Sequence, residues 1–175
     1  MIANKGQIMR TWGWKRVLKE VAVTAVLVVV ISNVISYIRQ PSLQSDRLPL
    51  IHDTLIGGEE FSTKGMEQKP LMVHFWATWC PVCKAEIDNI ERLSHYYNVI
   101  TIAVNSGSDQ EIKTFMKERG LSFAVINDQE GEWAGSFGVK GYPTTFIYDT
   151  DGVLQTSQVG YTSTAGLALR MWLAD

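Results

Sequence analysis

The chain has 175 residues, which is long enough for one ordinary domain with a sizeable core and too short for two full ones. Its composition, 46% hydrophobic and 19% charged, is typical of a globular protein. Residues 40–175 carry 10 lysines and arginines against 17 acidic residues, a net charge of −7, which argues against a nucleic-acid-binding protein.

An uncharged apolar run, VAVTAVLVVVISNVISYI, occupies residues 21–38 between Glu20 and Arg39. As a helix that rises about 1.5 Å per residue, it is long enough to cross a hydrocarbon core of roughly 30 Å. Soluble helices are rarely apolar on all faces. We therefore predict a single N-terminal transmembrane helix at residues 21–38.

The charges that flank this run predict its orientation. Lysines and arginines gather within residues 1–20, whereas only Arg39 and Arg47 follow closely. By the positive-inside rule, residues 1–20 are cytoplasmic and the chain after the span lies on the far side of the membrane. A cleaved signal peptide has the same layout, but this run is long for a signal core and no small-x-small cleavage site follows it. We expect an uncleaved, single-pass signal anchor.

The predicted anchor is followed by a linker and one exported domain. Residues 39–50 contain two prolines and mixed polar residues, which is typical of a linker, and the domain occupies residues 51–175. At the start of the domain, TLIGGEEFS (54–62) has the pattern of a small extra hairpin.

The remainder of the domain alternates between strand-like and helix-like patterns. The β-rich run LMVHFWA precedes a helical pattern from Pro81 to about Tyr97. A capping-box pattern at Ser108–Glu111 opens a second helix that ends at Gly120. This order predicts an α/β fold with a central mixed sheet flanked by helices. The predicted strands are 71–77, 99–104, 122–127, 144–149 and 153–160, and the last helix covers about 163–173.

Cys80 and Cys83 are the only cysteines, and two residues separate them. A disulfide across so small a loop is a poor structural staple, because stabilisation by loop closure grows with loop length. A zinc site needs about four ligands, and the three histidines, His52, His74 and His95, show no paired-ligand spacing. Copper(I) accepts two thiolates, so a copper(I)-binding or copper-delivery protein stays open as an alternative.

A redox pair explains the local pattern more fully. If the strand ends near Ala77, Cys80 lies at the N-terminus of the next helix, where unpaired N–H groups and the helix dipole favour a thiolate. Pro81 suits the first helical turn, and Cys83 lies on the same side of the helix as Cys80. We expect Cys80 to be the exposed attacking thiol, and the more buried Cys83 to resolve the mixed disulfide.

WATWCPVC (76–83), together with FGVKGYPTTF (137–146), resembles the thioredoxin superfamily. More narrowly, these motifs are similar to the membrane-anchored, extracytoplasmic reductases of the TlpA and cytochrome c maturation type, including the branch of suppressor of copper sensitivity protein D. The resemblance covers about residues 50–175. It implies a thioredoxin-like fold and a protein thiol:disulfide oxidoreductase, with the anchor in the inner (cytoplasmic) membrane and the catalytic domain in the periplasm.

The resemblance also implies roles for single residues. Cys80 and Cys83 match the nucleophile and the resolving cysteine, and Pro143 matches a cis-proline that packs against the disulfide. Tyr142 matches the residue whose backbone pairs with an extended substrate segment. Trp79 matches a tryptophan that borders the active surface.

Two further residues in the predicted active-site region have alternative roles. Glu86, in CxxCxxE, matches an acidic residue that tunes the titration of the thiols in cytochrome-maturation relatives, or it complements the helix dipole. His74 replaces the buried aspartate of ordinary thioredoxins. It is either a neutral, hydrogen-bonded core residue or a base that helps to deprotonate Cys83.

The expected partners follow from the resemblance and the predicted topology. The substrates are proteins with thiols or disulfides, and no metal or organic cofactor is expected beyond the redox-active Cys80–Cys83 disulfide. Cytoplasmic reductants cannot reach an exported domain, so a polytopic membrane electron donor is expected. Tethered relatives are mostly reductants, so we expect electrons to flow from this protein to its substrates, as in a reductase.

Overall fold

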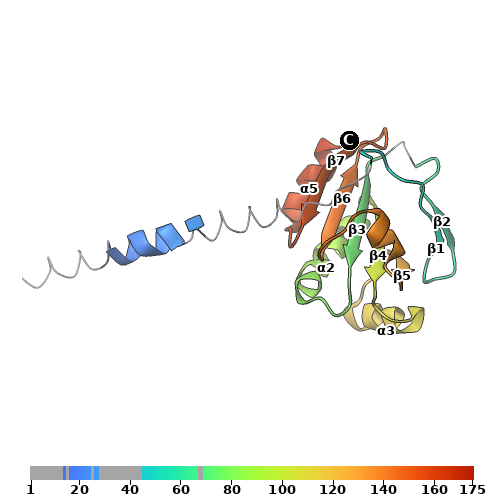
Figure 1. Ribbon diagram of the computed structural model, residues 1–175, viewed down its shortest axis with the longest axis horizontal. Helices are drawn as coiled ribbons and strands as arrows, with labels where there is room; N and C mark the ends of the chain where they lie inside the picture. The colour runs from blue at the N-terminus through green and yellow to red at the C-terminus, as the bar shows by residue number, and fades with distance from the viewer. Residues whose placement is uncertain (1–13, 15, 25, 28–44, 67–68) are drawn as a thin grey trace, which may run out of the picture. The chain divides into compact units, whose positions relative to one another are not determined.

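The computed structural model describes residues 14, 16–24, 26–27, 45–66 and 69–175 (Figure 1). They fall into two compact units, Met1–Ile38 and Arg39–Asp175. In the first unit, residues 16–24 and 26–27 are helical, and the Thr24 hydroxyl donates to the Glu20 carbonyl oxygen at 2.8 Å.

The transmembrane helix expected at residues 21–38 stays a prediction. None of the helices formed by the described residues is both long and apolar enough to span a bilayer. Most of the expected span, residues 25 and 28–38, lies outside the described part of the chain. Residues 1–13 of the expected cytoplasmic segment and residues 39–44 of the expected linker also lie outside it.

Part of the expected linker belongs to the second unit and pairs with its sheet. The Leu48 N–H donates to the Gly152 carbonyl oxygen at 2.7 Å, and the Leu154 N–H donates to the Asp46 carbonyl oxygen at 2.6 Å. Strands β1 (His52–Thr54) and β2 (Glu60–Ser62) then form a small antiparallel sheet, as the pattern of residues 54–62 suggests.

A five-stranded mixed sheet in the order β5-β4-β3-β6-β7 forms the centre of the domain. Three neighbouring strands are parallel, and the last two are each antiparallel to their neighbours. The expected α/β fold with a central mixed sheet is therefore confirmed. The strands are β3 (Leu71–Trp76), β4 (Asn98–Val104), β5 (Ala124–Asp128), β6 (Thr144–Tyr148) and β7 (Leu154–Val159).

One strand begins later than its apolar pattern predicts. β5 starts at Ala124 rather than at Ser122. The Glu91 carboxylate accepts hydrogen bonds from the backbone N–H groups of Ser122 at 2.8 Å and Phe123 at 3.2 Å. These two donors are thereby satisfied outside the sheet, so pairing with β4 begins only afterwards.

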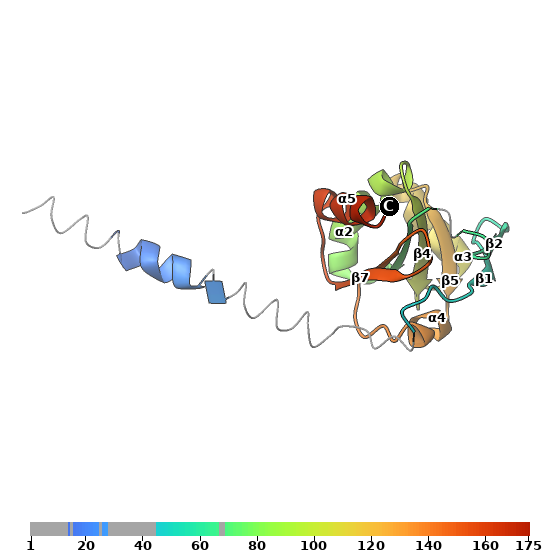
Figure 2. The ribbon, with the colours of Figure 1, turned by 90° about the horizontal axis from the view of Figure 1, so that it is seen from above.

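Helices cover both faces of the sheet. Helices α2 (Pro81–Ser94) and α5 (Thr164–Leu173) lie side by side on one face, as Figure 2 shows, and α3 (Asp109–Arg119) joins the same core. The short helix α4 (Glu132–Ser136), where sequence patterns predict no element, contributes Ala134 to the opposite core. The side chains of β3 are buried on both faces, which explains its continuous apolar run.

The cap at each end of α3 agrees with its sequence pattern. Ser108 and Glu111 form the expected capping box, and the helix ends at Gly120, whose φ of 65° is left-handed. Glycine adopts this conformation without a steric penalty, so the stop at residue 120 is encoded locally.

Candidate active site

The two cysteines form a disulfide at the start of α2, immediately after the loop that follows β3. Cys80 is the N-cap residue, with an extended backbone (φ −83°, ψ 117°), and its Sγ accepts from the Cys83 N–H at 3.2 Å. Pro81 occupies the first helical position, where a missing N–H breaks no helical hydrogen bond. The predicted place of Cys80 at a helix N-terminus is confirmed.

The two cysteines differ in exposure, although less than the sequence suggests. Cys80 is only 5% exposed and Cys83 is fully buried. Cys80 is therefore much less exposed than the sequence predicts, although it is still the more exposed of the two cysteines. The loop at Tyr142 covers Cys80, because the Tyr142 carbonyl oxygen lies 3.6 Å from Cys80 Sγ.

The loop that faces Cys80 contains a cis peptide bond between Tyr142 and Pro143. Its shape is held on both sides by hydrogen bonds. The Gly160 N–H donates to the Pro143 carbonyl oxygen at 2.8 Å, and the Thr144 hydroxyl donates to the Gly141 carbonyl oxygen at 2.7 Å. The fold thus places the Tyr142–Pro143 loop beside the disulfide, although Tyr142 is 62 residues from Cys80 in the sequence.

Trp79 forms an exposed edge of the site. Its ring is 56% exposed and meets the Tyr142 ring edge to face, with centroids 5.8 Å apart. The indole Nε1–H donates to the Asn105 carbonyl oxygen at 3.1 Å, and the Thr78 N–H donates to the Ser106 hydroxyl at 3.0 Å. The loop after β4 therefore supports the cysteine loop. Sequence reasoning missed Asn105 and Ser106, although the polar run NSGS directly after an apolar strand marks that loop.

Glu86 lies on the buried face of α2 and is fully inaccessible to solvent. One carboxylate oxygen, Oε1, accepts from the Thr162 N–H at 2.7 Å, whereas Oε2 has no partner among the described residues. Burial raises the pKa of Glu86 to about 7, although the bond from Thr162 opposes that rise. Glu86 can therefore exchange a proton near neutral pH.

His74 lies in β3 and is fully buried. Its Nδ1 is 2.9 Å from the Thr145 hydroxyl, and in the part of the chain that the structure describes its Nε2 has no partner. Burial lowers the pKa of His74 to about 3, so the ring is neutral at physiological pH. This low pKa favours the neutral, hydrogen-bonded role over that of a base.

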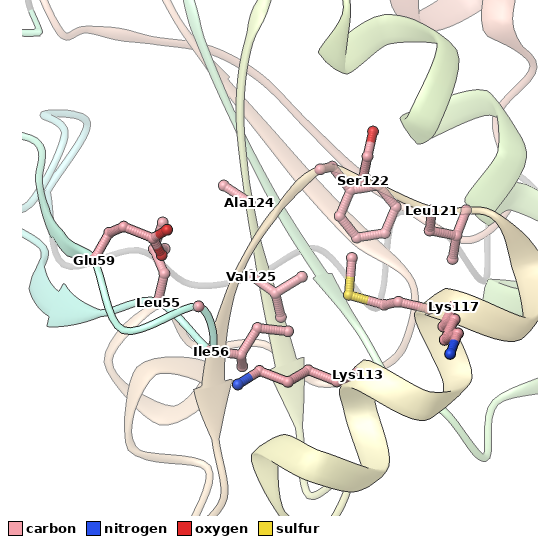
Figure 3. Close-up of a pocket in the computed structure, with 12 residues that line it drawn as sticks. Leu55, Ile56, Glu59, Lys113, Lys117, Leu121, Ser122, Ala124 and Val125 are labelled. Carbon is pink, nitrogen blue, oxygen red and sulfur yellow. The ribbon is translucent and has the colours of Figure 1, made fainter.

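A hollow of about 590 Å³ lies elsewhere, between α3, β5 and the loop that joins β1 to β2 (Figure 3). Its charged groups are Lys113 and Lys117 on α3 and Glu59 on the facing loop, and neither cysteine lines it. Among the described residues, no group of three or more His, Cys, Asp and Glu side chains could hold a metal ion. The cysteine pair is therefore the candidate active site.

Residues 45–157 match the AhpC/TSA family, which is more than half of the chain. The chain belongs to the AhpC/TSA family. Within this family it is a thioredoxin-like thiol-disulfide oxidoreductase, as the sequence motifs imply.

Two curated proteins and one solved structure illustrate the similarity. A thioredoxin-like protein of Haemophilus influenzae is 26% identical over 92% of this chain and 96% of its own length. The sporulation thiol-disulfide oxidoreductase A of Bacillus subtilis is 30% identical over 60% of this chain and 67% of its own. A thiol:disulfide interchange protein of the thioredoxin family from Chlorobium tepidum superposes with a TM-score of 0.64 at 26% identity, and covers 76% of this chain and 98% of its own.

The extent of these matches varies. Apart from the Haemophilus influenzae protein, the chain spans about two thirds or somewhat less of the length of these curated relatives. The family match begins at residue 45 and so includes the residues that pair with the turn between β6 and β7. It ends at residue 157, before Thr162 and α5.

Proposed function

We propose that the protein is a membrane-tethered, extracytoplasmic thiol:disulfide oxidoreductase that reduces disulfides in partner proteins. The observation that carries this proposal is the asymmetry of the cysteine pair. Cys80 caps α2 and keeps some exposed surface, whereas Cys83 is fully buried behind it. A substrate must reach the attacking thiol, but the resolving thiol need only reach its neighbour.

The proposed reaction has two steps. In the reduced protein, the Cys80 thiolate attacks a substrate disulfide, forms a mixed disulfide and releases one substrate sulfur as a thiolate, which takes up a proton from solvent. Cys83 then loses its proton and attacks Cys80 Sγ, which forms the Cys80–Cys83 disulfide and releases the second substrate thiol. Two electrons pass to the substrate, and a donor dithiol later returns two electrons to the protein.

The rim of the site is suited to an extended protein substrate. The Tyr142 carbonyl lies beside Cys80 and is a hydrogen-bond acceptor for a substrate backbone. Trp79 and Val82, which lie on either side of Cys80 in the sequence, add apolar surface to the rim, and they are 56% and 44% exposed. Pro143 fixes the loop opposite the disulfide and has no N–H that competes with the substrate.

Glu86 is the proposed acceptor for the proton of Cys83. A carboxyl with a pKa of about 7 matches the operating pH of a general base better than an imidazole with a pKa of about 3. Glu86 lies three residues after Cys83 on the buried face of α2, so both groups point toward the same core.

The proposed location rests on the sequence. The apolar run 21–38 and the basic residues before it support a single-pass anchor in the cytoplasmic membrane, with the catalytic domain in the periplasm. In this compartment a polytopic membrane protein is the proposed electron donor. The motifs at 76–83 and 137–146 support a similarity to the tethered reductases of the branch of suppressor of copper sensitivity protein D.

Trapping in cells tests the proposal. A full-length Cys83→Ala variant should accumulate mixed disulfides on Cys80 with exported proteins, because the resolving thiol is absent. The matched control, Cys80→Ala with Cys83 retained, should accumulate few, since Cys83 is buried. Equal adducts in both variants, or none in either, would contradict the proposal.

Copper binding tests the alternative function. The full chain, purified in reduced form, should reduce a protein disulfide catalytically. Tight copper(I) binding without any disulfide exchange would instead support a copper carrier and overturn the proposal.

A further inference from the structure

His74 lies between two buried threonines in a row across the central sheet. The strand registers place Thr101 of β4 on one side of His74 and Thr145 of β6 on the other. The neighbours of His74 on the same face of β3, Met72 and Trp76, belong to the hydrophobic core under α2. His74 is therefore a polar group in an apolar layer, where an unpaired donor costs free energy.

The two threonines use their hydroxyl groups differently. The Thr101 hydroxyl donates to the Ala124 carbonyl oxygen at 2.9 Å, so its proton is directed toward β5. The Thr145 hydroxyl lies 2.9 Å from His74 Nδ1. Among the described residues, Thr145 is thus the side-chain partner that His74 has.

The direction of this hydrogen bond follows from counting donors. If the Thr145 hydroxyl donates to Nδ1, the ring proton is on Nε2, and, counting the described residues, this N–H is the pair's only unpaired donor. If Nδ1–H donates to Thr145 instead, the hydroxyl proton lacks an acceptor and the bare Nε2 lacks a donor. The first arrangement leaves fewer unsatisfied groups in the core and is favoured.

The free Nε2 lies in the layer that α2 covers. Helix α2 follows β3 and returns antiparallel to it, and Cys83 shares a core cluster with Trp76 and Met72 on either side of His74. We propose that Thr145 is a positioning residue that holds His74 as the neutral Nε2–H tautomer, so that this N–H is a hydrogen-bond donor in the layer where the Cys83 thiolate forms.

This inference rests on the proposed reaction and adds one element to its second step. When Cys83 loses its proton, a negative charge appears on a buried sulfur, and an N–H donor in the same core layer favours that charged form. His74 neither gains nor loses a proton in this step. The proton of Cys83 passes to Glu86, and Cys83 Sγ then forms its bond to Cys80 Sγ. The bond between Cys80 Sγ and the substrate sulfur breaks in the same step, and the substrate leaves as a thiolate that takes up a proton.

Nitrogen NMR of the imidazole tests the tautomer directly. In the full-length, histidine-labelled protein, three imidazoles are expected, and a His74→Phe variant identifies the signal of His74. We expect Nε2 to be protonated and Nδ1 to be bare in the wild type and in Thr145→Ser. In Thr145→Val the single tautomer should be lost, and in the matched control Thr101→Val it should be kept.

The kinetics of the two steps separate positioning from general packing. Stopped-flow measurements should show resolution of the mixed disulfide slowed about tenfold by Thr145→Val, the expected effect of losing one hydrogen bond. Formation of the mixed disulfide should not change. Thr145→Ser should restore the rate, and in a His74→Phe background Thr145→Val should have no further effect.

Several results would overturn the inference. They are a proton on Nδ1 in the wild type, an unchanged tautomer in Thr145→Val, or an equal slowing of both steps by that variant. If Thr145→Val does not fold, the wild-type and Thr145→Ser tautomers still decide the question. A protein without exchange activity but with the Nε2–H tautomer would refute the proposed function and leave the His74–Thr145 pairing intact.

Discussion

The carboxylate of Glu86 accepts a hydrogen bond from the backbone N–H of Thr162 at 2.7 Å. This bond ties α2, the helix that carries both cysteines, to the loop before α5. It occupies one carboxylate oxygen, and the other, in the core, meets no hydrogen-bond partner within the described ranges of the chain. Glu86 therefore has a fixed position and a raised pKa at the same time, which suits a group that exchanges protons with a buried thiol.

A Glu86→Gln substitution should change the pH dependence of resolution. In the wild type, the rate should rise with pH through about 7, because Glu86 accepts a proton only when it is ionised. Glutamine still offers an oxygen to Thr162 but cannot take the proton. Stopped-flow kinetics of the Cys80 mixed disulfide measure this profile, and an identical rise in the variant would exclude Glu86 as the acceptor.

Two buried groups should give opposite pH dependences to the free energy of unfolding. Because burial raises the pKa of Glu86 from 4.5 to about 7, the folded state binds that proton more tightly, and stability falls as the pH rises across this interval. Burial lowers the pKa of His74 from 6.5 to about 3, so stability rises with pH there. Between pH 4.5 and 6.5 the two slopes, each at most about 1.4 kcal/mol per pH unit, oppose each other.

Single substitutions should separate these slopes. From pH 4.5 to 6.5, Glu86→Gln should have a free energy of unfolding that rises more steeply than that of the wild type. His74→Phe should shift the slope the other way, because only the contribution of Glu86 is left. Urea unfolding of the oxidised protein at several pH values measures these free energies, and three parallel curves would contradict the account.

A Trp79→Phe substitution should weaken the binding of protein substrates more than the binding of small disulfides. The indole bond to Asn105 and part of the apolar rim are lost, so KM for a protein substrate should rise several-fold. Stability should fall by less than about 1 kcal/mol, because the ring is mostly exposed. Trp172→Phe on α5, where the ring is also exposed, is the control and should leave KM unchanged. An equal rise in KM for a small disulfide would show that the substitution had affected the reacting cysteines and not only the apolar rim.

Sequence patterns predicted the order of strands and helices because each element repeats its own signal over several residues. The apolar run of β3 and the Ser108 capping box are local features, and so is the step from strand to CPVC. The pairing of Pro143 with the cysteines depended instead on the resemblance of the whole motif, since a proline before a strand rarely indicates a cis bond.

The partners of single polar groups could not be predicted in this way. The bonds from Thr162 to Glu86 and from Thr145 to His74 join residues more than 70 positions apart. A single backbone N–H or hydroxyl in a loop or strand has no periodic signal that reveals its partner. The same holds for the Asn105 carbonyl, which supports Trp79 only because two loops meet in space.

The most direct test of the central claim is the pH dependence of alkylation at each cysteine in the reduced full-length protein. Cys80 should react first, with an apparent pKa well below the ordinary value for a thiol, because it caps a helix N-terminus. Cys83 should be protected by burial. Preferential alkylation of Cys83, or an unshifted pKa at Cys80, would contradict the assignment of Cys80 as the attacking thiol.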